Sequence, residues 1–210
     1  MDLRGLARQL DTLRVALSQA PITSDPALSK VADDRAEFYL WERDAVRLLQ
    51  IPGIAGGYGF KRGDDVFSSG LYAAWAYRLR GDHAAAQAAF DSACVRLESA
   101  LGRDPDDWGL HAALGLAQAG RGRIAEALGE ARWLQESAVY REDHFDGPSL
   151  AESRAQILAQ AGEPDAALDE IERLLAEPSW LSVNALRLDP IWDPIREQPR
   201  FKALVKKYSS

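Results

Sequence analysis

The side chains best suited to chemistry in this chain are three histidines and one cysteine. His83, His111 and His144 lie far apart in the sequence, and Cys94 stands alone. No serine or cysteine lies in a motif that would pair with a histidine for nucleophilic catalysis. We expect Cys94 to be structural, because a free cysteine on a helix commonly behaves as a small apolar side chain. No catalytic residue is therefore predicted.

Two segments could hold a ligand. Residues 142–146, Glu-Asp-His-Phe-Asp, offer carboxylates and an imidazole to a hard or borderline metal ion. No further ligands follow at a recognisable spacing, so a solvated loop before a helix is the preferred interpretation. The glycine-rich segment 53–63 lacks the Gly-Lys-Ser/Thr ending of a phosphate-binding loop and the spacing of a dinucleotide fingerprint. We expect a connection between helix pairs there, and no metal or other cofactor in the protein.

The composition is that of a water-soluble globular protein. The chain has 210 residues, of which 47% are hydrophobic and 27% charged, enough to bury a sizeable core. A net charge of −7 disfavours nucleic acid, because phosphate binding needs a basic face. No signal-peptide pattern occurs, and no apolar stretch approaches the roughly 20 residues that span a bilayer. We expect a cytoplasmic protein without a membrane partner, or else a fragment of a longer membrane protein.

The elements that position these side chains are predicted to be helices. Apolar residues recur at spacings of three and four, and no segment alternates convincingly as a strand would. The first such stripe is Leu3, Leu6, Leu10, Leu13 and Leu17. Asp-Pro pairs at 25–26, 189–190 and 193–194 predict helix starts. Ser149 to Glu152 has the spacing of a capping box, which would place another start there.

An internal repeat is the strongest pattern in the sequence. Gly81, Gly122 and Gly162 recur at intervals of 41 and 40 residues, and each precedes an alanine by five positions. A glycine allows a tight turn after one helix, and a small alanine lets the next helix pack closely against it. Repetition at this period predicts stacked helical hairpins. The alanines and the core positions four and seven residues beyond them are Ala86, Phe90, Ala93, Ala127, Ala131, Leu134, Ala167, Ile171 and Leu174.

These positions resemble the tetratricopeptide repeat family. Its pattern places a small residue seven before the turn glycine, an aromatic four before it and a bulky residue nine after it. The first unit matches with Ala74, Tyr77, Gly81, Ala86 and Phe90. The resemblance implies an all-α solenoid, a right-handed superhelix of antiparallel helix pairs. The chain departs from the family in its longer period, in Gln118 where an aromatic is usual and in Arg154 where an aliphatic is usual.

The chain is expected to form a single helical-repeat domain over residues 1–210. Residues 1–66 would hold N-terminal helices with a degenerate repeat from Arg35 to Leu49 and Asp44 in its turn. Residues 67–178 would hold three repeats, and residues 179–210 a C-terminal cap. That last segment resembles the end of repeat domains attached to bacterial signalling proteins, behind a serine/threonine kinase, a nucleotide cyclase or a transcription-regulator module. No kinase or cyclase motif is present in this sequence.

In this architecture the first helix of each hairpin lines a concave groove. The groove would be aromatic at one end, lined by small residues in the middle and polar at the other end, which suits an extended segment or helix of a partner. Its aromatic residues either bind that partner or are buried between neighbouring helices. The predicted groove residues are Leu71, Tyr72, Trp75, Arg78, Leu79, Leu116, Glu152, Gln156 and Gln160.

The leading functional hypothesis is therefore a protein–protein interaction module, the docking or sensory part of a bacterial signalling protein. Its partner would be a protein or peptide, whose identity and oligomeric setting the sequence leaves open. One alternative is a helical solenoid that binds a small ligand or mainly self-associates. A second alternative is an enzyme with an unrecognised site in residues 53–63 or 142–146.

Overall fold

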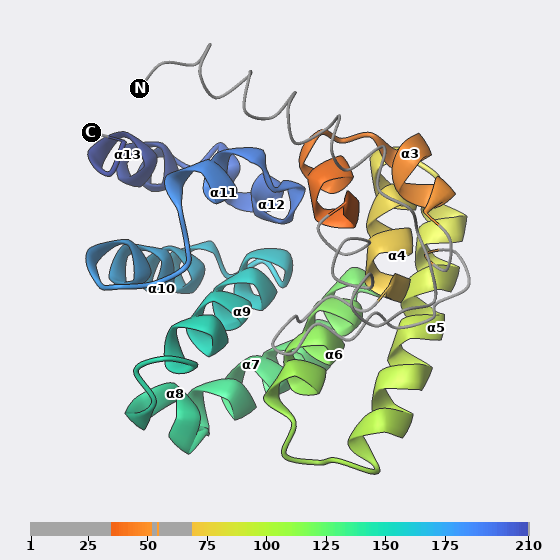
Figure 1. Cartoon of the computed structure of the whole chain (residues 1–210), viewed down its shortest axis with the longest axis horizontal. Coiled ribbons are helices and arrows are strands. Elements are labelled where there is room, and N and C mark those ends of the chain that lie inside the picture. The colour runs from red at the N-terminus through yellow and green to blue at the C-terminus, as the bar shows by residue number, and fades with distance from the viewer. Residues whose placement is uncertain (1–34, 52–53, 55–68, 210) are drawn as a thin grey trace.

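The computed structural model describes residues 35–51, 54 and 69–209, and within these ranges the protein is all-α, without a strand (Figure 1). The all-α prediction is confirmed for this part of the chain. The central hairpins are α4 (Ser69–Leu79) with α5 (His83–Leu101), α6 (Trp108–Gly120) with α7 (Ile124–Glu136), and α9 (Gly147–Gln160) with α10 (Pro164–Ala176). Residues 1–34 and most of the glycine-rich segment 53–63 lie outside the described residues.

Shorter elements flank these hairpins. Helical residues 35–41 and α3 (Ala45–Gln50) precede them, and α8 (Ala138–Glu142) connects α7 to α9. After α10 follow α11 (Val183–Leu188), the 3₁₀ helix η1 (Pro190–Trp192), α12 (Asp193–Arg196) and α13 (Pro199–Lys207). Successive elements pack in order: α5 lies against α6, and both α6 and α7 lie against α9. The C-terminal elements turn back, so that α13 packs on α10, while η1 and α12 pack on α9.

The three repeat glycines close the helical hairpins as the sequence predicts. Gly81, Gly122 and Gly162 have φ of 73°, 77° and 83°, a region that side chains with a Cβ rarely adopt. In each turn the next residue donates its N–H across the helix end to a carbonyl five positions earlier, at 2.9 Å. This bond pattern is the glycine-ended helix terminus, and it satisfies a carbonyl that the helix leaves unpaired.

The same turn occurs a fourth time, earlier in the chain. Asp44 donates its N–H to the Tyr39 carbonyl at 2.9 Å, and Arg43, at the glycine position, has φ of 57°. The Asp44 carboxylate then accepts from the Arg47 N–H at 3.0 Å and caps α3. The degenerate repeat predicted here therefore has the hairpin turn of the others, with an arginine in the left-handed conformation.

The repeat alanines are buried at the helix contacts. Ala86, Ala127 and Ala167 are at most 3% exposed, and all the core positions predicted four and seven residues beyond them are buried as well. Glycines of α6 allow further close packing. A Cβ on Gly115 would lie 2.5 Å from Ile157, and one on Gly120 would lie 2.4 Å from the Phe90 ring. The small residues of α6 thus serve contacts between helices.

The capping-box prediction at Ser149 to Glu152 is wrong. The helix begins earlier, at Gly147, with Pro148 in its first turn, where the missing N–H of proline costs nothing. Ser149 lies inside the helix, and its carbonyl accepts from the Ser153 hydroxyl at 2.9 Å. The Glu152 side chain is therefore not used in capping.

Candidate functional site: the inner face

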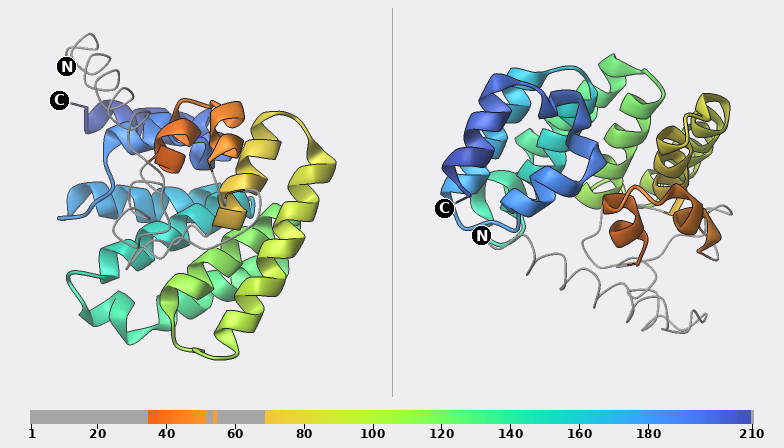
Figure 2. Two further views of the ribbon diagram at one scale, coloured as in Figure 1. Left: turned by 45° about the vertical axis from the view of Figure 1, so that its right-hand side comes forward. Right: turned by 90° about the horizontal axis from the view of Figure 1, so that it is seen from above.

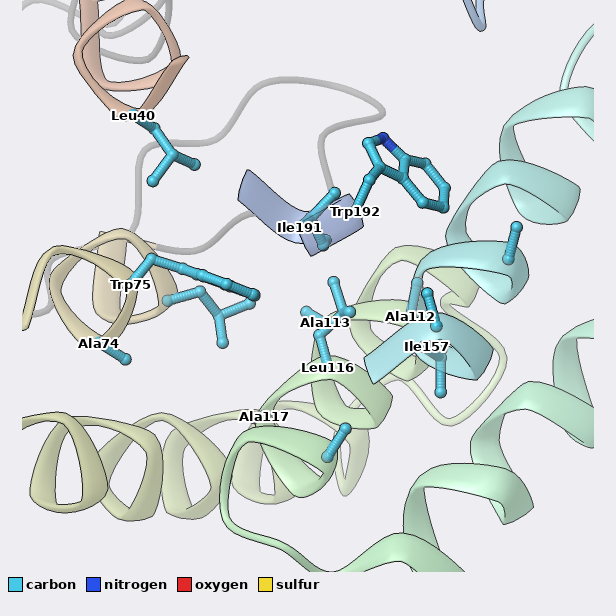
Figure 3. Close-up of a cluster of buried hydrophobic side chains, with 14 of the residues drawn as sticks. Leu40, Ala74, Trp75, Ala112, Ala113, Leu116, Ala117, Ile157, Ile191 and Trp192 are labelled. Carbon is cyan, nitrogen blue, oxygen red and sulfur yellow. The ribbon is translucent and has the colours of Figure 1, made fainter. Parts of the chain in front are cut away.

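The sides of α4, α6 and α9 that face η1 form what we call the inner face. Figure 3 shows Trp75 of α4 and Leu116 of α6 turned towards a common centre, with Ile157 of α9 on one side and Leu40 on the far side. From η1, Ile191 and Trp192 enter the same cluster. All six side chains are at most 4% exposed. The inner face is thus an apolar surface that the C-terminal segment of the same chain covers.

The predicted groove residues are consequently more enclosed than an open groove would leave them. Arg78 is the one exposed member, and Leu79, Glu152 and Gln160 are partly buried. The buried members are Leu71, Tyr72, Trp75, Leu116 and Gln156. Of the two alternatives for the α4 aromatics, burial by neighbouring elements is the one found here. Their role in binding a partner stays a prediction.

Polar side chains at the edge of the inner face hold the C-terminal segment. The Arg78 guanidinium lies 4.6 Å from the centre of the Trp75 ring and donates to Gln160 Oε1 at 3.2 Å. Gln160 in turn donates its Nε2–H to the main-chain carbonyl of Ile191 at 2.5 Å. The Gln160 side chain therefore joins α4, α9 and η1. Its bond to η1 is made to the main chain, so it does not depend on which side chain stands at position 191.

An ion pair links the two ends of the described chain. Both terminal nitrogens of Arg43 donate to the Asp193 carboxylate at 2.7 Å, although 150 residues separate the two side chains. α12, which carries Asp193, accordingly lies beside the helical residues 35–41 in Figure 1, and Figure 2 shows the same neighbours from two further sides. Burial alone would raise the pKa of Asp193, but hydrogen bonds from Arg43 and Arg196 outweigh it and lower the pKa below its usual value. Paired arginine and carboxylate in this geometry form a directional contact.

Arg196 organises the same segment from the other side. Its guanidinium donates to the main-chain carbonyls of Leu186, Arg187 and Asp189 at 2.6–2.7 Å. These carbonyls belong to the end of α11 and the turn into η1, and the Asp189 carbonyl also accepts from the Trp192 N–H at 3.2 Å. The partly buried guanidinium of Arg196 therefore fixes the path from α11 to α12 through three main-chain acceptors.

Two carboxyl groups beside the inner face have strongly raised pKa values. Burial raises the pKa of Glu152 to about 7, and the charges of Asp189 and Glu37 add to this shift. Burial likewise raises the pKa of Asp189 to about 6, against a hydrogen bond from the Ile191 N–H at 2.9 Å that lowers it. Two carboxylates in one poorly solvated region repel each other, so the neutral form is favoured.

These shifts predict a pH-dependent stability. Between pH 4.5 and 7 Glu152 is protonated in the native state and ionised in the unfolded chain. Its stabilising contribution to the free energy of unfolding is therefore complete below pH 4.5 and is lost as the pH rises through 7. A Glu152→Gln variant is neutral throughout. We expect its free energy of unfolding, relative to the wild type, to rise by about 1–3 kcal/mol between pH 4.5 and 8. Denaturant titrations at several pH values measure this difference.

The comparison removes titrating groups that do not interact with Glu152, because their contributions are common to both proteins. Asp143, Asp193, Glu172 and Glu197 have lowered pKa values and act in the opposite direction, but equally in wild type and variant. Glu126→Gln, at an exposed position in the first turn of α7, is the matched control and should show a constant difference. A pH-independent difference for Glu152→Gln would show that this carboxyl is not perturbed.

The other candidate residues lie apart from the inner face. Among the described residues, no group of three or more histidine, cysteine or acidic side chains could hold a metal ion. His111 contacts Glu130 at 2.6 Å and the Pro105 carbonyl at 2.9 Å, and its ring stacks on Trp133. Cys94 is fully buried, and burial raises the pKa of its thiol, which makes it a poor nucleophile. These contacts and this burial are those of structural side chains, for His111 and for Cys94.

No helix in the described part of the chain is long and apolar enough to cross a bilayer. Comparison of the chain with family models, with curated proteins and with solved structures found no match.

Proposed function

We propose that the protein is an interaction module of tetratricopeptide type whose inner face binds a segment of another polypeptide. One observation carries this proposal: the inner face already holds an irregular segment of this chain, Pro190–Trp192. It does so with a large apolar cluster around Trp192 and a side-chain amide on a main-chain carbonyl. A buried aromatic anchor oriented by main-chain hydrogen bonds is a recurring way to bind a peptide.

The partner segment would share the chemistry of the resident one. It would present a bulky apolar side chain to the cluster of Trp75 and Leu116, and a free backbone carbonyl to Gln160. The partner segment would also have to displace η1. Because η1 belongs to the same chain, it competes for the inner face at a high effective concentration. Binding is thereby coupled to release of the C-terminal segment, and the Arg43–Asp193 pair opposes that release.

The finer architecture belongs to the same proposal. Four hairpin turns with one hydrogen-bond pattern support a solenoid, and the packing of α13 on α10 supports a capping role for residues 179–210. A place in a bacterial signalling protein rests on the sequence resemblance. The sequence of any regions encoded with this domain would test it, since a kinase, cyclase or regulator module is expected there.

The binding proposal is tested by panning a random peptide library against the immobilised full chain. We expect recovered peptides to contain a bulky apolar residue and to bind with micromolar Kd. An Asp193→Ala variant should bind them about threefold more tightly, because it loses the exposed ion pair with Arg43 that opposes release of η1. Isothermal titration calorimetry measures the change.

The matched control is Gln87→Ala Arg103→Ala, which removes an exposed glutamine and arginine from α5 and the turn after it. This variant should bind the peptides as the wild type does. The proposal fails if no peptide binds above background, or if the Asp193→Ala variant binds them unchanged.

A further inference from the structure

Two aromatic rings lie exposed at one edge of the hairpin stack. Phe145, between α8 and α9, is 68% exposed, and Trp180, between α10 and α11, is 74% exposed. Their ring centres are 6.5 Å apart, edge to face at 85°. No other phenylalanine or tryptophan among the described residues is exposed to this degree. Large apolar side chains that gather on a surface commonly mark an interaction site.

Both rings project from connections that are held in place. The Asp143 carboxylate accepts from the Phe145 N–H at 2.7 Å and from the Asp146 N–H at 2.9 Å, and these bonds lower its pKa. On the other connection, the Ser179 hydroxyl donates to the Leu174 carbonyl at 2.6 Å, and Leu181 is buried directly after Trp180. Because both connections are already ordered, binding of a partner to the rings costs little conformational entropy in this chain.

The surroundings of the pair are acidic. The end of α8 and the two connections, residues 143–146 and 177–182, carry the carboxylates of Glu142, Asp143, Asp146 and Glu177. Two arginines lie on the adjoining helices: Arg141 donates to the Glu136 carbonyl at the end of α7, and Arg173 pairs with Glu177 at 3.2 Å, so the carboxylates outnumber them. The faces of aromatic rings also carry partial negative charge and attract cations, tryptophan most strongly. The ring faces and the carboxylates therefore both favour a positively charged partner.

We propose that the Phe145–Trp180 pair is a docking surface for a segment of a protein partner that carries arginine or lysine beside an apolar side chain. This inference rests on the proposed function and adds a second contact surface to it, outside the inner face. The basic side chain stacks on Trp180 with its charge near the carboxylates, and the apolar one packs against Phe145. A second copy of this chain is a poorer occupant, because it would bring two sets of carboxylates together.

The test uses two blocked peptides, Gly-Arg-Leu-Arg-Leu-Arg-Gly and its counterpart with glutamine in place of arginine. Each is titrated into the full ¹⁵N-labelled chain at physiological salt. Binding of the arginine peptide should shift the amide signals of residues 142–147 and 177–182. The glutamine peptide should bind at least fivefold more weakly, and Trp180→Ala should weaken the arginine peptide at least fivefold.

Two control variants complete the design. Val95→Ala removes an apolar side chain that is 66% exposed on α5 and should bind the arginine peptide as the wild type does. Asp193→Ala, the variant that tests the inner face, should also bind it normally, so failure of the inner-face proposal and failure of this one give different results. Equal binding by Trp180→Ala, equal binding of the glutamine peptide, or a wild-type dimer that Trp180→Ala makes monomeric in sedimentation would each overturn the proposal.

Discussion

Replacing Trp192 with alanine is expected to lower the free energy of unfolding by about 3–5 kcal/mol. Trp192 is 1% exposed and is the largest fully buried side chain among the described residues. It lies in the inner-face cluster, so its loss leaves a cavity between the C-terminal segment and the hairpins (Figure 3). Urea denaturation followed by circular dichroism measures the change, with the midpoint shifted and the slope retained.

Trp180→Ala is the matched control for this experiment. It makes the same substitution in the same C-terminal segment, at a position that is 74% exposed. Its effect should stay within about 0.5 kcal/mol, the usual range for surface positions. Similar small effects of both substitutions would contradict the packing of η1 on the inner face, because an unanchored tail would tolerate either.

The hairpins could be predicted from the sequence because their determinants are local. A turn that needs positive φ selects glycine, and a close helix contact selects alanine five residues later, so both appear as residue types at fixed spacing. The fourth turn lacks this signature, because Arg43 occupies the left-handed position. Its conformation depends on surrounding contacts, including the pair with Asp193 far along the chain, which no local pattern encodes.

The occupant of the inner face could not be predicted in the same way. Ile191 and Trp192 belong to one apolar cluster with side chains of α4 and α6 that lie more than 70 residues earlier, and the segment that carries them has no repeat spacing. One indication was available: residues 71–76 and 112–119 are almost continuously apolar. A helix that is hydrophobic on all sides is buried on all sides, which argues against an open groove along it.

The departures from the family pattern are explained by partners on neighbouring helices. Gln118, where an aromatic is usual, is buried and donates to Glu98 at 3.4 Å. Arg154, where an aliphatic is usual, pairs with Glu170 of α10 at 2.5 Å. The same carboxylate also accepts from the Tyr140 hydroxyl and from Arg173. A polar cluster thus joins α8, α9 and α10 where apolar packing would be expected.

Glu170→Ala is therefore expected to cost about 3–5 kcal/mol, because it leaves the guanidinium of Arg154 poorly solvated and without its partner. The Glu170 side chain is 8% exposed and that of Arg154 15%. Glu172→Ala, on the same helix but 41% exposed and paired with Arg200, is the matched control. It should cost about 0–1 kcal/mol, as exposed ion pairs do. Thermal and urea unfolding measure both variants.

A double variant separates the cost of an unpaired charge from the value of the ion pair. Arg154→Leu restores the aliphatic residue of the family pattern, and Glu170→Leu removes the carboxylate with it. Because buried ion pairs gain little over apolar packing of similar volume, we expect the double variant to be more stable than Glu170→Ala by about 1–4 kcal/mol. If the double variant is no more stable than Glu170→Ala, the ion pair itself contributes to stability. Arg154 then stabilises the third hairpin more than the aliphatic residue of the family pattern would.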